Sequence, residues 1–117
     1  MPYNRGDVIL VLFPDSNLVT AKRHPALVVQ ADRLQTGLAQ TIVAMITSNL
    51  SRAGHPSRVT VSRSSPQGMC MGLLSDSVIM TDNLATVLDS EIDRAIGRCN
   101  EMRPVDVALC STLGLTF

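Results

Sequence analysis

The sequence predicts a single, mainly β domain, folded as a small barrel that a C-terminal α-helix closes. Its 117 residues have the length of one ordinary domain, so residues 1–117 are expected to form one unit. Short apolar segments rich in β-branched residues recur at close spacing over most of the chain, which is typical of small barrels. Only the end of the chain changes to helical spacing, with one apolar face formed by Val105, Ala108, Leu109, Thr112 and Leu113.

Six segments have the composition of β-strands. The run at residues 7–13 is compact and apolar, as in a buried strand. A proline opens the segment at residues 25–30, where it removes no hydrogen bond from the middle of a ladder. The full set of expected strands is 7–13, 25–30, 40–47, 58–62, 77–81 and 85–88. Residues 92–99 fit either a strand or a helix.

The connections between these segments lack a regular apolar period or carry turn-forming residues. The expected loops and turns are residues 14–24, 31–39 and 48–56, the sequence SSPQG at 64–68, and Asp82–Asn83. Pro104 suits the first turn of the terminal helix, because the N–H group of that position has no partner inside a helix.

The composition excludes several classes of protein. The net charge is zero, which argues against a basic nucleic-acid coat protein or a polybasic membrane binder. No apolar run approaches the roughly 18–20 residues of a membrane span, so we expect a cytoplasmic protein with no membrane partner. Aromatic residues make up only 3% of the chain, too few for a nucleic-acid site built on base stacking. The three cysteines, at positions 70, 99 and 110, have no zinc-ligand spacing and are expected to be buried, reduced thiols, with no metal site.

The charge is divided unevenly along the chain. Residues 1–63 carry seven Lys and Arg against three Asp and Glu, whereas residues 64–117 carry three against seven. One interpretation is a basic face that binds phosphates, and the other is that the charges scatter over a solvated surface after folding. The charges alone do not decide between the two.

Polar residues that interrupt the apolar pattern are the candidates for a site. Lys22, Arg23 and His24 combine two cations, which can hold a phosphate, with an imidazole, which can move a proton near neutral pH. Hydroxyl and amide groups stand at the end of the strand at residues 40–47, where they would bind a phosphate oxygen or simply cap a turn: Thr47, Ser48 and Asn49. No nucleophilic triad, phosphate-binding loop or carboxylate cluster is present. A nuclease with this sequence should therefore act without a metal and on RNA, whose 2′-OH supplies the nucleophile.

Five segments, in order along the chain, resemble the MazF/PemK family of toxin ribonucleases from toxin–antitoxin pairs. They are RGDVILVLFP at 5–14, RHPALVVQAD at 23–32, TIVAMITSN at 41–49, DSVIMTDNLATV at 76–87 and the tail VDVALCSTLGL at 105–115. The resemblance implies a small SH3-like β-barrel with helices, as in MazF, PemK and CcdB, that acts as a homodimer. It also implies the toxin of a type II toxin–antitoxin system, a metal-independent mRNA interferase that needs no cofactor and cleaves single-stranded RNA with some sequence preference. The partner that blocks such a toxin is an antitoxin with an acidic, partly disordered segment.

The resemblance also implies site residues. Thr47 stands at the family's active-site threonine, where it would orient the scissile phosphate. The family places an arginine directly before the proline of the second strand. Here His24 occupies that position and Arg23 precedes it, so we assign proton transfer to His24 and stabilisation of phosphate charge to Arg23. The products would be a 2′,3′-cyclic phosphate and a 5′-OH. The residues expected to contact RNA nearby are Lys22, Ser48, Asn49, Arg52 and Asn83, the last at a place where the family often has glutamine.

Two other functions fit the same family. A CcdB-like toxin would bind DNA gyrase by protein contact and would not catalyse a reaction. A barrel that has lost its activity would remain as a binding module.

Overall fold

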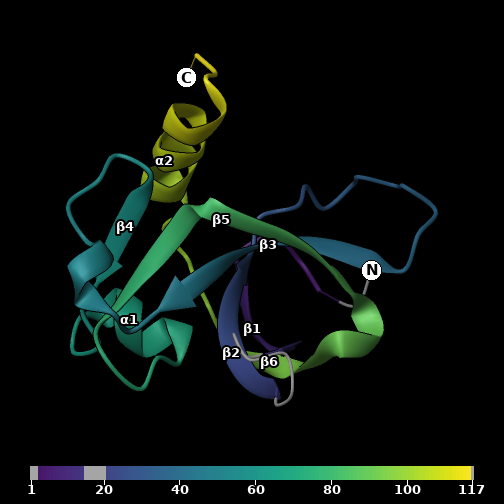
Figure 1. The fold of residues 1–117 in the computed structure, drawn as a ribbon, viewed down its shortest axis with the longest axis horizontal. Coiled ribbons are helices and arrows are strands. Elements are labelled where there is room, and N and C mark those ends of the chain that lie inside the picture. Colours follow the sequence, from purple (N-terminus) through teal and green to yellow (C-terminus); the bar gives the residue numbers. More distant parts are fainter. Residues whose placement is uncertain (1–2, 15–20, 117) are drawn as a thin grey trace.

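The main element of the fold is one antiparallel sheet of six strands in the order β4-β5-β3-β2-β1-β6 (Figure 1). The computed structural model describes residues 3–14 and 21–116. Its strands are β1 (Asp7–Pro14), β2 (Ala21–Val28), β3 (Gln40–Thr47), β4 (Arg58–Val61), β5 (Ser77–Leu88) and β6 (Ile92–Arg98). Its helices are α1 (Pro66–Met71) and α2 (Arg103–Leu113), with the 3₁₀ turns η1 (Leu50–Arg52) and η2 (Asp89–Glu91).

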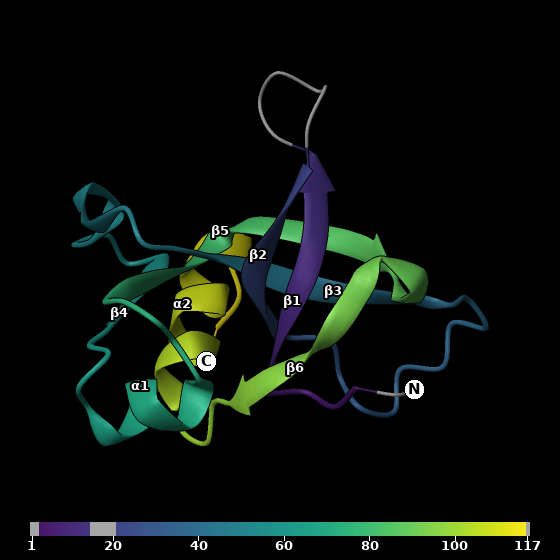
Figure 2. The same cartoon turned by 90° about the horizontal axis from the view of Figure 1, so that it is seen from below.

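The predicted fold class, mainly β with a C-terminal helix, is confirmed, but the barrel is not closed. The sheet curls so that β5 passes across β1 and β2, and β6 runs back from the end of β5 to pair with β1 (Figure 1, Figure 2). Within the described residues, β4 pairs only with β5 and β6 only with β1, so these two strands are the edges of the sheet. The helices α1 and α2 lie with β4 at one side of the curl (Figure 1).

Two apolar clusters occupy the two faces of the sheet, because neighbouring residues of a strand point to opposite sides. The cluster inside the curl contains Ile9, Val11, Ala26, Val28, Val43, Val87 and Ile92. The cluster under the helices contains Val8, Leu27, Ala44, Ile46, Val61, Met71, Leu73, Ile79, Cys99 and Val105. We call them the inner cluster and the helix-side cluster.

The strand β2 begins earlier than predicted. Part of the expected loop at 14–24 lies outside the described residues, but Ala21–His24 pair with β1 as a strand, with Val11 opposite His24 and Leu12 opposite Arg23. The loop expectation was wrong here because pairing with β1 overrides the polar composition. Pairing of β2 with β3 starts only at Ala26, directly after Pro25, which has no N–H to contribute to a ladder. The two strands therefore separate at Pro25, on the N-terminal side of Ala26.

The turn predicted at Asp82–Asn83 is also wrong. The strand β5 runs unbroken from Ser77 to Leu88, and the two expected strands at 77–81 and 85–88 are its halves. Between Ala44 and Met45 of β3 the opposite residue on β5 changes from Leu84 to Met80. Residues 81–83 therefore form a bulge, which bends the strand without ending it.

The structure also defines the segments at residues 64–68 and 92–98, one as the start of a helix and the other as a strand. The sequence SSPQG, expected as a turn, is the start of α1: the Ser65 side chain accepts a hydrogen bond from the Gly68 N–H at 3.0 Å, and Pro66 stands in the first turn. Residues 92–98 form the edge strand β6.

The helix α1 lies in backbone contact with β6. Its C-cap, Gly72, has a φ of 71°, a left-handed conformation that glycine adopts readily. A Cβ atom on Gly97 of β6 would lie 2.3 Å from the Met71 carbonyl carbon, so only glycine fits there. This close approach places the chain after α1 beside the sheet.

The uneven charge of the two halves of the chain is partly neutralised in the fold. Three arginines of the first half pair with carboxylates of the second: Arg5 with Asp106, Arg23 with Asp93 and Arg58 with Asp82. Three of the seven Lys and Arg residues in 1–63 are therefore compensated by carboxylates of the second half. Within the described residues, no helix is both long and apolar enough to span a membrane.

Candidate functional site

Two adjoining pockets open where β2 and β3 part. The first, which we call the Leu74 pocket, has a volume of about 400 Å³ and a largely apolar wall. Its lining residues are Leu10, Arg23, His24, Pro25, Ile46, Thr47, Ser48, Gly72, Leu73, Leu74, Ser75, Ser77 and Ile96. The second, the Asn83 pocket, has a volume of about 530 Å³ and is more polar; it is lined by His24, Met45, Ile46, Thr47, Asn49, Arg52, Met80 and Asn83.

His24 and Thr47 stand at the junction of the two pockets. Both residues line both pockets, together with Ile46. The strands β2 and β3 pair Ala26 with Met45, and continuing that register by two residues places His24 opposite Thr47. The two residues are on the same face of the sheet as Met45, which packs on the inner cluster. The fold thus brings an imidazole and a hydroxyl that are far apart in the sequence to the same two pockets.

Arg23 points to the opposite side of β2 from its neighbour His24, because side chains alternate along a strand. It lines only the Leu74 pocket. Its Nε lies 3.1 Å from the Asp93 carboxylate of β6, which also pairs with Arg94 at 2.7 Å. The Arg23 side chain remains 61% exposed, so the pair is open to competition from a bound anion.

Thr47 and Asn49 organise the turn that follows β3. The Thr47 Oγ1 accepts a hydrogen bond from the Asn49 N–H at 3.1 Å, and the Asn49 side-chain oxygen accepts one from the Ser51 N–H at 3.2 Å. The turn-capping role considered for these residues is therefore present in the fold. A hydroxyl that accepts one hydrogen bond keeps its own hydrogen to donate, so the Thr47 O–H can still bind a phosphate oxygen.

Two polar side chains form the outer wall of the Asn83 pocket. Arg52 ends the turn η1, and Asn83 lies in the bulge of β5. In the described part of the chain, the side-chain amide of Asn83 makes no hydrogen bond, and this residue is exposed. The amide is accordingly open to donate to and accept from a ligand.

The predicted site residues are almost all gathered at these pockets. Seven of them line one or both: Arg23, His24, Thr47, Ser48, Asn49, Arg52 and Asn83. Lys22 lies in β2 and is exposed but lines neither pocket. The placement brings the residues together, and their chemical roles remain proposals.

Residues 4–112 match the family described as PemK-like, MazF-like toxin of type II toxin-antitoxin system. The chain belongs to this toxin family. Among the solved structures it resembles, a mycobacterial endoribonuclease in complex with its cognate antitoxin has a TM-score of 0.73 at 23% identity, with 98% of each chain covered. The Mycobacterium tuberculosis toxin MazF-mt6 has a TM-score of 0.73 at 20% identity, covering 95% of this chain and 99% of that one.

A third similar structure of the MazF type comes from Deinococcus radiodurans. It is a MazE-MazF crystal structure with a TM-score of 0.72 at 19% identity, and the alignment covers 97% of this chain and 98% of that one. At these identities the comparisons establish a shared MazF-like fold. Compared with curated protein sequences, the chain matches none.

Some residues of the pockets of this MazF-like toxin carried no signal in the sequence. Leu73, Leu74 and Ser75 follow α1 and reach the Leu74 pocket because of the tight contact between α1 and β6. Nothing in the sequence shows that Asp93 holds Arg23 or that Asp82 pairs with Arg58. Only the fold shows which cation each carboxylate meets.

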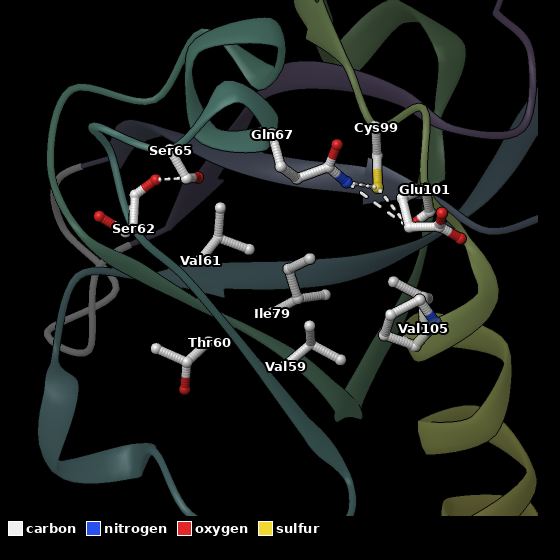
Figure 3. Close-up of a pocket in the computed structure, with 11 residues that line it drawn as sticks. Val59, Thr60, Val61, Ser62, Ser65, Gln67, Ile79, Cys99, Glu101 and Val105 are labelled. Atoms are coloured by element: carbon white, nitrogen blue, oxygen red, sulfur yellow. Dashed lines mark hydrogen bonds between the residues drawn. The ribbon is translucent and has the colours of Figure 1, made fainter.

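A separate cavity lies on the helix side of the sheet, between β4 and the start of α2 (Figure 3). It has a volume of about 280 Å³ and a mostly apolar wall that includes Val59, Ile79 and Val105. At its polar end the Gln67 amide donates a hydrogen bond to the Cys99 sulfur at 2.9 Å (Figure 3). Burial raises the pKa of the Cys99 thiol, which favours the protonated form.

The other potential metal ligands of the toxin are dispersed. Within the described residues, no group of three or more His, Cys, Asp or Glu side chains is close enough to hold a metal ion. The three cysteines are unpaired, as expected, but only Cys99 is buried. Cys70 is exposed on the short helix α1, so the expectation that all three are buried was wrong.

Proposed function

We propose that this toxin is an endoribonuclease that cleaves single-stranded RNA at the junction of the Leu74 and Asn83 pockets. The observation that carries the proposal is that His24 and Thr47 both line the two pockets, while Arg23 lines the Leu74 pocket and Arg52 the Asn83 pocket. Structures of the same fold are named endoribonucleases, which supports this choice over a purely binding function.

The proposed reaction uses the RNA itself as nucleophile. The 2′-oxygen attacks the adjacent phosphorus as the bond from phosphorus to the 5′-oxygen breaks, which leaves a 2′,3′-cyclic phosphate and a 5′-OH. The proton of the 2′-OH passes to a base and the leaving 5′-oxygen gains a proton, with His24 serving one of these two transfers and solvent water the other. An imidazole can perform such transfers near neutral pH, so we assign one of them to His24. Thr47 donates its hydroxyl hydrogen to a phosphate oxygen and thereby orients the group. The reaction as proposed requires no metal or cofactor.

The negative charge that develops on the phosphate needs a fixed positive charge nearby. Arg23 reaches the junction from the Leu74 pocket once its exposed pair with Asp93 gives way to the phosphate. Arg52 approaches from the Asn83 pocket, on the same side as His24 and Thr47. We assign Arg23 to the scissile phosphate and Arg52 to the neighbouring one.

The remaining polar residues of the pockets would contact the nucleotides next to the cut. Asn83 and Asn49 carry amides that can read base edges, and Ser48 can bond a phosphate or sugar oxygen. Lys22 would add charge outside the pockets. A modest sequence preference follows from such contacts, since unstacked bases expose their hydrogen-bonding edges.

The partner that inhibits the toxin is proposed to be a cognate antitoxin with an acidic, partly disordered segment laid over these pockets in the cytoplasm. Two of the similar structures are named as complexes, a mycobacterial endoribonuclease with its cognate antitoxin and MazE-MazF from Deinococcus radiodurans. An acidic segment would compete for the same cations as RNA, and its affinity should fall with added salt because surface charges are screened. An affinity that does not change between low and high salt would contradict this arrangement.

We also propose a homodimer that forms through the edge strand β4 and the helix α2. The outer edge of β4 is unpaired in the described structure, and a groove of about 650 Å³ runs beside it along α2. Exposed apolar side chains on α2 include Val107 and Leu113, 44% and 54% exposed. A second copy would cover this surface. Sedimentation should show a dimer at micromolar concentration and a monomer for V107E; a monomeric unsubstituted protein would refute the proposal.

The test of the main proposal is incubation of the purified protein with single-stranded RNA in EDTA. We expect fragments ending in a 2′,3′-cyclic phosphate, and strongly reduced cleavage by H24A and T47V. T47S, which keeps the hydroxyl, is the matched variant and should retain most activity. Intact RNA together with gyrase–DNA cleavage complexes would instead indicate a CcdB-like toxin. If the protein neither cleaves RNA nor forms gyrase–DNA cleavage complexes, it is an inactive binding module.

A further inference from the structure

Arg58 of β4 ties together two elements that are separate in the sequence. Its Nη2 donates to Asp82 Oδ2 at 2.7 Å and its Nε lies 3.4 Å from Asp82 Oδ1. Its third nitrogen, Nη1, donates to the backbone carbonyl oxygen of Arg52 at 3.2 Å. The Arg58 side chain is only 22% exposed, and all three of its nitrogens have a partner.

The two elements held by Arg58 are the outer walls of the Asn83 pocket. Asp82 directly precedes Asn83 in the bulge of β5, and Arg52 ends the turn η1. Both Asn83 and Arg52 line that pocket, whereas Arg58 does not; it borders the groove beside α2 instead. Arg58 therefore influences the pocket from behind its walls.

The bulge is fixed on its other side as well. The Thr81 hydroxyl lies 2.6 Å from the Ser57 carbonyl oxygen, to which it donates, and 2.8 Å from the hydroxyl of Thr112 on α2. Thr81 is fully buried. With Thr81 and Asp82 both held, the next residue, Asn83, is presented to the pocket in a defined position. The hydrogen bond from Arg58 lowers the pKa of the Asp82 carboxyl, which keeps the pair charged.

We propose that Arg58 is a positioning residue that sets the RNA sequence preference by fixing the two walls of the Asn83 pocket relative to each other. This inference rests on the proposed ribonuclease function. The planar guanidinium offers donors in a rigid fork and can hold a carboxylate and a carbonyl at once; the lysine ammonium is a point charge on a flexible chain and cannot reproduce that geometry. A base bound by Asn83 is discriminated only if the amide is held in place, so loosening the walls should relax the preference.

The test measures cleavage of RNA oligonucleotides randomised around the cut. For R58Q we expect the preference at one flanking nucleotide to fall by about tenfold, as for one lost base-edge contact. The KM of the preferred substrate should rise, whereas kcat should stay within about threefold because His24 and Thr47 are untouched. R58K should resemble R58Q, since it keeps the charge but not the fork.

A double variant shows whether Arg58 acts through Asn83. N83A should relax the same nucleotide position, and R58Q combined with N83A should be no worse than N83A alone. Additive losses would overturn the proposal. R98Q breaks another ion pair, Arg98–Asp7 at 2.9 Å, whose residues line neither pocket, and should leave the preference unchanged. D82N is the milder variant if R58Q fails to fold, and it should relax the same position.

A measurement without RNA separates this inference from the proposed function. In R58Q, NMR should show shifts of the Asn83 side-chain amide and of the Ser51 and Arg52 backbone amides, with R98Q as the unshifted control. If the protein cuts no RNA, the proposed function fails, and the positioning role is then judged by these signals alone. Unshifted signals in a folded R58Q would overturn the positioning role even if the protein is an active ribonuclease.

Discussion

Replacing Asp93 by asparagine should strengthen RNA binding. In the structure, one Asp93 carboxylate oxygen holds Arg23 at 3.1 Å and so competes with a phosphate for the same guanidinium. The Asp93 and Arg23 side chains are 32% and 61% exposed, a setting in which an ion pair contributes about 0.2–1 kcal/mol. If the pair must break when RNA binds, D93N removes that cost and lowers the Kd by roughly 1.5- to fivefold.

The assay is fluorescence anisotropy with an RNA that carries a 2′-deoxynucleotide at the cut site, so that binding is measured without cleavage. D7N is the matched control, because it also removes one negative charge and breaks an ion pair, Asp7–Arg98, whose residues line neither pocket. The gain in RNA affinity for D7N should be smaller than for D93N and should disappear with added salt, as expected of a long-range charge effect.

A double variant assigns the gain to Arg23. Asp93 also pairs with Arg94, so D93N releases both arginines. D93N combined with R23A should lose the improved affinity, whereas D93N combined with R94Q should keep it. If D93N binds RNA no better than D7N, Arg23 does not take the phosphate, and Arg52 becomes the main cation of the site.

Three further predictions follow from individual residues. H24A should lower the cleavage rate by about 10²- to 10⁴-fold and remove the dependence of that rate on pH near neutrality. If H24A cleaves RNA at nearly the unsubstituted rate with the same pH profile, His24 only packs beside Pro25. The pKa of Asp82 is lowered in the folded state, so its contribution to stability is full above the usual carboxyl range near pH 4 and is lost as the pH falls through the lowered value. In urea unfolding between pH 6 and 2.5, the free energy of unfolding should therefore depend less steeply on pH for D82N than for the unsubstituted protein. Parallel curves for the two proteins would contradict this. G97A should lower the free energy of unfolding by about 1–3 kcal/mol, since its Cβ would meet the backbone of α1 at 2.3 Å, and an unchanged urea midpoint would show that α1 moves aside without cost.

Local patterns in the sequence were sufficient for several elements. Residues 40–47 were predicted as a strand and form β3 with the same bounds, because a dense β-branched run has few other stable conformations. The terminal helix was equally readable, since Val105 and Ala108 recur at helical spacing and are buried. The polar residues Thr47 to Asn49 were predicted as site candidates because they end an apolar strand, and they do lie at the two pockets.

Contacts between residues far apart in the chain decided the secondary structure of segments that the sequence left ambiguous or for which the sequence prediction was wrong. Asp82–Asn83 has the composition of a turn, yet it became a bulge within β5 because Thr81 and Asp82 find partners on α2 and β4. The segment at 92–98 became a strand because the edge of β1 was available to it.

The site itself was only partly contained in the sequence. Residue types and their positions after strands indicated which side chains to consider, because polar groups seldom interrupt apolar runs without a local reason. The sequence did not show that Arg23 and His24 point to opposite faces of β2, since the strand was expected to begin after them. Nor did it show that Arg58 joins the walls of the Asn83 pocket. Those relations depend on the register between strands and on ion pairs between residues far apart in the chain, and both exist only once the sheet has formed.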